Sequence, residues 1–82
     1  MSNTVSHAYL LGIREARGTL RTHEKECGPL TLEDARGLLA NSEECARMGF
    51  TGEALETVKG ERDFWRNQVK RLFNHHSHAR KV

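Results

Sequence analysis

The sequence predicts an all-α fold, a single three-helix domain with long antiparallel first and third helices and a shorter helix that bridges them. Apolar residues recur at spacings of three and four along three segments, as they do on one face of a helix. Glycine-containing breaks separate the segments, and no stretch alternates apolar and polar residues as a strand would. The chain has 82 residues, which is enough for one small domain and too few for two.

The first helix is predicted over residues 5–27. Its apolar face begins at Tyr9 and reaches Cys27 by steps of three and four residues. Gly28 and Pro29 follow it. Glycine accepts the left-handed conformation of a helix C-terminus, and proline cannot continue the hydrogen-bond ladder, so this pair ends the helix.

The second helix is predicted over residues 31–48. Thr31 is followed three residues later by Asp34, a spacing that resembles a capping box. The hydroxyl of Thr31 is therefore expected to accept a hydrogen bond from a backbone N–H of the first turn. Gly49 provides the second break in the chain.

The third helix, predicted over residues 52–74, is the longest. Its seam has the spacing of a coiled coil and contains one arginine: Leu55, Val58, Arg62, Trp65, Val69 and Leu72. An arginine on an apolar seam needs a carboxylate, an aromatic face or solvent, and a salt bridge to Glu15 or another acid of the first helix is expected. The adjacent Phe64 and Trp65 point about 100° apart around the helix, so one of them is expected to lie on a second interface.

The charge of the chain is unevenly distributed. Lysine and arginine number 13 against 11 acidic residues, a net charge of +2. After Asp63, however, every charged residue is basic: Arg66, Lys70, Arg71, Arg80 and Lys81. This basic tip either complements the dipole of its own helix or contacts nucleic acid or an acidic protein. Residues 75–82 lack apolar periodicity and are predicted to fray.

The sequence contains no motif of catalysis, cofactor binding or metal binding. A phosphate-binding glycine loop, a nucleophile elbow and a His-Glu-x-x-His run are all missing. Cys27 and Cys45 lack the paired spacing of a zinc site and are expected to be reduced thiols. We therefore expect no enzymatic activity, no cofactor and no metal.

The expected compartment is the cytoplasm. The sequence has no apolar run of the roughly 20 residues that span a bilayer, and its N-terminus does not resemble a signal peptide. No contact with a membrane is therefore expected.

Residues 45–60 resemble the helix-turn-helix of DNA-binding regulators. The pattern rests on Cys45, Met48, Gly49, Phe50, Thr51, Leu55 and Val58. The residues that would read DNA are Thr51, Glu53, Thr57 and Lys59, together with Gly52 and Glu56. Two carboxylates and a single lysine fit a duplex poorly, because the phosphates repel them. The segment is therefore either a structural connection between two helices or a DNA reader.

Residues 9–15 and 60–68 resemble stretches in small accessory proteins of bacteriophages and prophages, a group that includes the anti-CRISPR proteins. The resemblance implies a protein that inhibits a host protein or defence complex by direct contact in the bacterial cytoplasm. It carries no catalytic residue with it.

The expected partner surface lies on the third helix and combines arginine with aromatic residues, as binding hot spots do. Its members are Arg62, Phe64, Trp65, Arg66, Lys70 and Arg71. The alternatives are a small DNA-binding regulator that uses residues 45–60 and a nucleotide- or nucleic-acid-binding sponge built on the basic tip. Few aromatic residues and two heptad-like seams also predict a homodimer.

Overall fold

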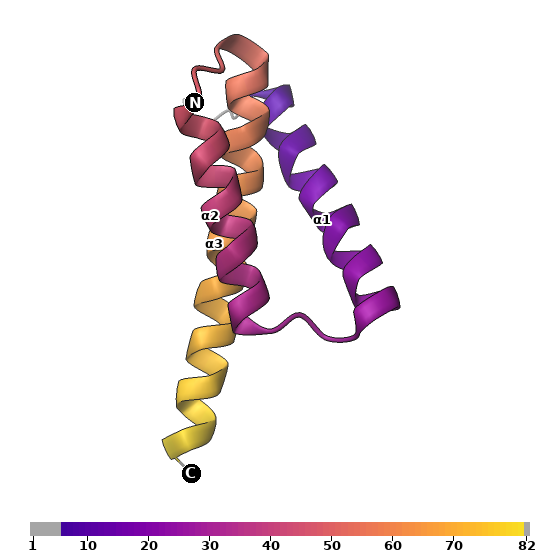
Figure 1. The fold of residues 1–82 in the computed structure, drawn as a ribbon, viewed down its shortest axis with the longest axis vertical. Coiled ribbons are helices and arrows are strands. Elements are labelled where there is room, and N and C mark those ends of the chain that lie inside the picture. Colours follow the sequence, from indigo (N-terminus) through magenta and orange to yellow (C-terminus); the bar gives the residue numbers. More distant parts are fainter. Residues whose placement is uncertain (1–5, 82) are drawn as a thin grey trace.

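The computed structural model describes residues 6–81, with the side chains of residues 6–74, and consists of three helices (Figure 1). These are α1 (His7–Cys27), α2 (Leu32–Arg47) and α3 (Gly52–Lys81), and the described residues contain no strand. The all-α fold with long first and third helices and a shorter second helix is confirmed. The bounds of α1 and α2 agree with the prediction to within one residue wherever both can be compared; the predicted start of α1, Val5, lies outside the described residues.

Local capping groups set the helix ends. The hydroxyl of Ser6 accepts a hydrogen bond from the Tyr9 backbone N–H at 3.0 Å and so begins α1. Thr31 accepts one from the Asp34 N–H at 3.1 Å, as its sequence position predicted. At the other end of α1, Gly28 has a φ of 93°, a value that L residues with side chains rarely adopt.

Helix α3 continues to Lys81, whereas the sequence predicted that it ends at Asn74 and that residues 75–82 fray. The prediction relied on the loss of apolar periodicity, but residues 75–81 contain no glycine or proline that would end a helix. Cations in the last turn also favour the helix dipole. The side chains of residues 75–81, including those of Arg80 and Lys81 in the predicted basic tip, and all of Val82 lie outside the described part.

The predicted antiparallel arrangement of the first and third helices is wrong, because α1 and α3 run parallel. Ser6 lies beside Glu56, and Tyr9 reaches Asp63, so residue numbers rise together along both helices. The physical reason is the short connections: each of the two turns reverses the chain, and two reversals restore the first direction (Figure 1). Helix α2 is the antiparallel neighbour of α3.

Helix α3 is the centre of the fold, since α1 and α2 each pack along it and make no comparable contact with each other. Figure 1 shows α1 tilted away from α2 toward its C-terminal end. There His23 Nε2 lies 3.4 Å from Asp34 Oδ2 and links the end of α1 to the first turn of α2. Two faces of α3 therefore pack against helices, and its remaining face can carry polar side chains.

The hydrophobic core is thin and lies where the three helices meet. Its buried members are Ala16, Leu30, Ala35 and Trp65, surrounded by the partly buried Leu20, Leu38, Leu39, Phe64, Val69 and Leu72. Trp65 is 3% exposed and has the largest side chain of these four residues. Within the described residues, no helix is both long and apolar enough to cross a bilayer.

Candidate partner-binding surface

The six residues predicted to bind a partner do not share one face of α3. Trp65 lies in the core, so it is not accessible to a partner in this structure. Phe64 is half-buried and stands edge-on to Trp65, with ring centroids 5.0 Å apart and an interplanar angle of 85°. The expected divergence of the two rings is present, and Phe64 is the more exposed of the two, although it also packs against the core.

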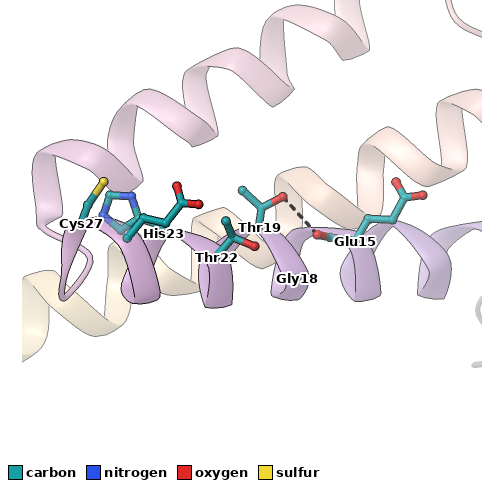
Figure 2. Close-up of a pocket in the computed structure, with 7 residues that line it drawn as sticks. Glu15, Gly18, Thr19, Thr22, His23 and Cys27 are labelled. Carbon is teal, nitrogen blue, oxygen red and sulfur yellow. Dashed lines mark hydrogen bonds between the residues drawn. The ribbon is translucent and has the colours of Figure 1, made fainter.

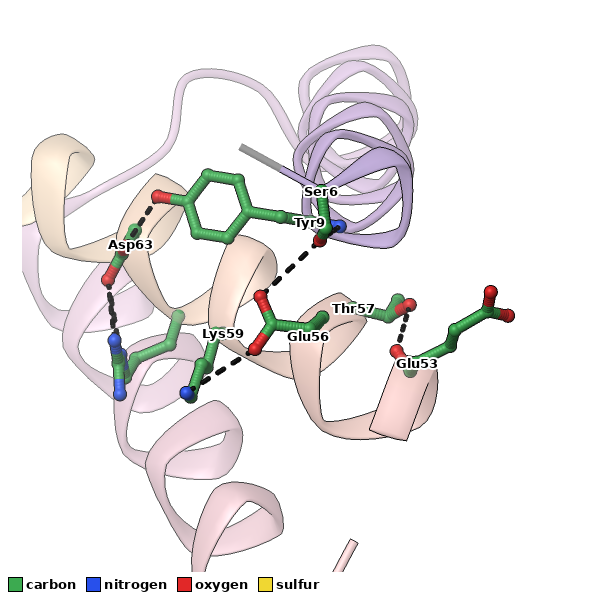
Figure 3. A network of polar contacts seen from close by, with 8 residues as sticks. Ser6, Tyr9, Glu53, Glu56, Thr57, Lys59 and Asp63 are labelled. Atoms are coloured by element: carbon green, nitrogen blue, oxygen red, sulfur yellow. Dashed lines mark hydrogen bonds and ion pairs between the residues drawn. The ribbon is translucent and has the colours of Figure 1, made fainter. Parts of the chain in front are cut away.

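The Asp63 carboxylate organises a polar network between α1 and α3 (Figure 3). Tyr9 donates its hydroxyl hydrogen to Asp63 Oδ2 at 2.5 Å, and Arg62 donates to Oδ1 from Nε at 3.1 Å and from Nη2 at 3.0 Å. The expected pair between Arg62 and Glu15 is therefore replaced by a contact within α3. Neighbouring side chains on one helix already satisfy the guanidinium, so a carboxylate from another helix is not required.

Burial raises the pKa of Asp63, but the hydrogen bonds from Tyr9 and Arg62 and the charges of Arg62 and Arg66 outweigh it, so the pKa lies below its usual value. The same contact raises the pKa of the Tyr9 hydroxyl, mainly because that group donates to Asp63 and secondly because it is buried. The network therefore carries a stable negative charge beside two arginines.

Arg66 lies next to a notch between α2 and α3. The notch has a volume of about 260 Å³ and is lined by Glu43, Ala46, Arg47, Arg62 and Arg66. Arg66 Nη2 is 3.8 Å from Glu43 Oε2, and Nη1 is 3.7 Å from Asp63 Oδ1. Both distances exceed the 2.7–2.9 Å typical of a charge-assisted hydrogen bond. The two carboxylates therefore orient the guanidinium without saturating its donors.

Toward the C-terminal end of α3, Arg62, Arg66, Lys70 and Phe73 follow one another at spacings of four, four and three residues. Residues at these spacings lie on one side of a helix. Lys70 is exposed, and Phe73 is 53% exposed. We call these four residues the cationic stripe. Arg71, the sixth predicted residue, points elsewhere and donates to Gln68 Oε1 from Nε at 3.1 Å and from Nη2 at 2.6 Å.

Two members of this surface were missed at the level of the sequence. Phe73 is not among the residues predicted to bind a partner, and neither is Arg47, which belongs to α2. The spacing from Arg62 through Arg66 and Lys70 to Phe73 is visible in the sequence and would have found Phe73. Arg47 approaches the stripe only because α2 folds back along α3, and no local pattern carries that information.

The residues of the alternative DNA-reading face are partly engaged within the protein (Figure 3). Thr57 donates its hydroxyl to the Glu53 carbonyl at 2.9 Å, and its own backbone carbonyl lies against Gly12 of α1. Lys59 pairs with Glu56 at 3.4 Å, which uses the only cation of the face. Thr51 remains exposed at the start of α3.

Helix α2 lies antiparallel and lengthwise along α3, as in an αα-hairpin (Figure 1). DNA-binding helix-turn-helix units cross their helices at about 90–120°, which leaves the second helix free to enter the major groove. Here α1 covers the corresponding part of α3. The arrangement favours the structural interpretation of residues 45–60.

A second, open groove runs along α1 and has a volume of about 600 Å³ (Figure 2). Its lining residues are Glu15, Gly18, Thr19, Thr22, His23, Glu26 and Cys27. No hydrogen bond joins the thiol of Cys27 to the imidazole of His23 among the described residues, so no base-activated thiol is formed in this structure. The described histidine, cysteine and acidic side chains form no group of three that could hold a metal ion.

Glu15, at one end of this groove, faces Glu61 of α3. Burial raises the pKa of Glu61, and the charge of Glu15 and a hydrogen bond with it raise the pKa further. Two carboxylates in contact favour retention of one proton between them. At neutral pH this pair therefore destabilises the contact between α1 and α3.

Comparisons with known proteins give no match: no family model, no curated protein and no solved structure is significantly similar to this chain.

Proposed function

We propose that this protein binds a host protein or a host defence complex and inhibits it by direct contact in the bacterial cytoplasm, as anti-CRISPR proteins do, without catalysing a reaction. The observation that supports this best is the cationic stripe. It places arginine, lysine and an exposed phenylalanine on one side of the longest helix. Arginine and aromatic residues dominate binding energy at protein interfaces.

The way α3 is held also supports a binding role. Helices α1 and α2 pack along two other sides of α3, so the stripe is presented by a helix whose position is already determined. A surface that is ordered before binding loses less conformational entropy when the complex forms. The two arginines and the lysine of the stripe would speed the encounter with an acidic partner, and Phe73 would slow dissociation.

Affinity capture from a bacterial lysate, carried out with and without nuclease, tests this proposal. We expect the wild-type chain to retain a defined protein after nuclease treatment. The double variant Arg66→Gln, Phe73→Ala should lose it. The control variant Arg17→Gln removes the same charge at an exposed position away from the stripe and should still capture the protein.

Two outcomes would overturn the proposal. One is capture that disappears with nuclease, which would indicate nucleic acid as the ligand and favour the sponge. The other is recovery of one duplex site from random DNA at physiological salt, lost on changing Thr51, Glu53 or Thr57. That result would replace the inhibitor by a DNA-binding regulator.

We also propose that the chain forms a two-fold dimer. Leu10 and Leu11 are 50% and 40% exposed near the start of α1, and Met48 and Phe50 are 68% and 42% exposed in the turn before α3. Covering these side chains would remove apolar surface from water. Sedimentation equilibrium should therefore show twice the mass of 9.3 kDa, and a single species of 9.3 kDa at tens of micromolar would contradict the dimer.

A further inference from the structure

We propose that the notch lined by Arg47, Arg62 and Arg66 binds an aspartate or glutamate side chain of the partner protein, and that Glu43 occupies this position in the free chain. The inference rests on the proposed function, because it names the chemistry by which the partner is recognised. It assigns Glu43 the role of an internal competitor for Arg66.

The arginine donors in the notch are not used up. Arg66 is held between Glu43 and Asp63 at 3.8 and 3.7 Å, outside hydrogen-bond distance. Arg47 Nη2 lies 3.5 Å from Glu44 Oε1, and that pair is about 70% exposed on both sides. Each guanidinium has five N–H donors in a planar fork. Those of Arg47 and Arg66 make no hydrogen bond among the described residues, and both can still receive a carboxylate in bidentate geometry.

The unused donors of the lining favour an anion. Three arginines and one carboxylate, that of Glu43, line a volume of about 260 Å³. Glu44 and Asp63 pair with Arg47 and Arg62, so the charges around the notch are balanced, and the attraction comes from guanidinium N–H groups that make no hydrogen bond among the described residues. A carboxylate that enters would meet a fork of matching shape. The neighbouring alanine, Ala46, leaves room beside the guanidiniums, since its side chain is a single methyl group.

A protein carboxylate fits this site better than a nucleic-acid backbone does. Glu43, Glu44 and Asp63 are interspersed with the arginines. A continuous row of phosphates laid across the site would pass these acidic side chains and be repelled by them. A single side-chain carboxylate can enter between them.

Glu43 gives the site selectivity. A partner carboxylate that takes its place exchanges one ion pair for another, so this exchange alone contributes little net affinity. Additional contacts, such as those at Lys70 and Phe73 farther along the stripe, are needed to make displacement favourable. Random acidic surfaces would then bind weakly, and a partner that also matches the stripe would bind tightly.

Fluorescence anisotropy with a fluorescein-labelled oligoglutamate peptide tests the site, and an oligoglutamine peptide of equal length is the control probe. We expect the glutamate peptide to bind weakly, because it lacks the further contacts of a partner, and the glutamine peptide not to bind. Arg66→Gln should weaken its binding by about tenfold, the loss of one charge-assisted contact. Glu43→Gln should tighten binding by roughly threefold to tenfold, because it removes the competitor.

Matched variants separate this site from general electrostatics. Arg17→Gln and Glu24→Gln change the net charge by the same amounts at exposed positions on α1. We expect each to change peptide binding by less than about twofold. Circular dichroism of every variant checks that the helices remain intact.

The inference is overturned if Glu43→Gln alters binding no more than Glu24→Gln does, or if Arg66→Gln has no larger effect than Arg17→Gln. It is also overturned if a labelled duplex DNA of equal charge binds more tightly than the peptide with the same dependence on Arg66. If lysate capture succeeds while the peptide tests fail, the carboxylate site is rejected and the proposed inhibitor function is retained. If the peptide tests succeed while lysate capture fails, the inhibitor function is rejected and the carboxylate site is retained.

Discussion

The two helices that pack on α3 do so in different ways. At the α1–α3 crossing, Gly12 lies against the backbone of Thr57, and Gly60 lies against the backbone of Tyr9. A Cβ atom at either glycine would overlap a carbonyl oxygen of the opposite helix. On the other side, α2 contributes Ala35, Leu38 and Leu39 to a contact made of side chains.

This difference shows that the same central helix is held by two kinds of packing. The α1–α3 contact depends on the absence of side chains, because only then can the two backbones approach. The α2–α3 contact depends on apolar volume, which can be redistributed among neighbouring side chains. We therefore expect the first contact to tolerate almost no added atom and the second to tolerate conservative changes.

Trp65→Ala should have the largest effect on stability, because its ring lies in the core where α1 and α2 both reach α3. We expect a loss of about 3–5 kcal/mol in the free energy of unfolding. Phe73→Ala, at a position that is 53% exposed, should change it by less than about 0.5 kcal/mol. Urea unfolding followed by circular dichroism measures both, and equal effects would place Trp65 outside the core.

Gly12→Ala and Gly60→Ala test the backbone contact. Each adds one methyl group against backbone of the facing helix, which cannot move aside as a flexible side chain can. We expect each to lower the free energy of unfolding by about 2–3 kcal/mol, as overpacking does. The same urea unfolding measurement applies.

Two controls sharpen the contrast between the contacts. Gly18→Ala adds the same methyl group to α1 where nothing lies within 4 Å, so helix propensity should raise stability by about 0.5–1 kcal/mol. Leu39→Met, on the α2 side, conserves volume and should cost less than about 1.5 kcal/mol. If Gly12→Ala behaves like Gly18→Ala, the two backbones do not touch.

Tyr9→Phe removes the hydrogen bond that α1 donates to Asp63. At neutral pH we expect a loss of about 1 kcal/mol in unfolding free energy. Because the pKa of Asp63 is lowered in the folded chain, its stabilising contribution is present above the unfolded pKa and is lost as pH falls through the folded pKa. The difference between wild type and variant should therefore shrink in unfolding curves recorded at progressively lower pH below about 4.

Glu61→Gln should have the smallest effect and the opposite sign. The pKa of Glu61 is raised in the folded chain, so this residue favours folding only below its unfolded pKa and opposes it as pH rises through the folded value. At neutral pH the variant should be more stable by about 0.5 kcal/mol. The gain should fade when thermal unfolding is repeated at acidic pH.

Much of the local structure could be predicted from single segments. The Thr31 cap and the break at Gly28 depend on residues within one helical turn, and the structure has both. The continuation of α3 past Asn74 was missed, since exposed helix requires only the absence of helix breakers and not an apolar face. The cationic stripe was predicted in part, from Arg62, Arg66 and Lys70.

The relations between helices could not be predicted in this way. Arg62 was assigned to Glu15 and instead pairs with Asp63, because its own neighbour satisfies it at a shorter separation. Trp65 was assigned to a partner surface and lies in the core. A helical pattern shows which residues share a face, but it does not show what covers that face.

The sequence by itself determined that this chain forms three helices, where two of its breaks fall and which charges α3 carries, because helix formation and capping are decided by groups within four residues of one another. Tertiary structure alone decided that α1 runs parallel to α3, that Gly12 and Gly60 each lie against the backbone of the facing helix, and that Arg47 joins the arginines of α3. These features join residues far apart in the chain. They depend on which surfaces fit when packed, and close packing is a property of facing pairs that neither segment contains alone.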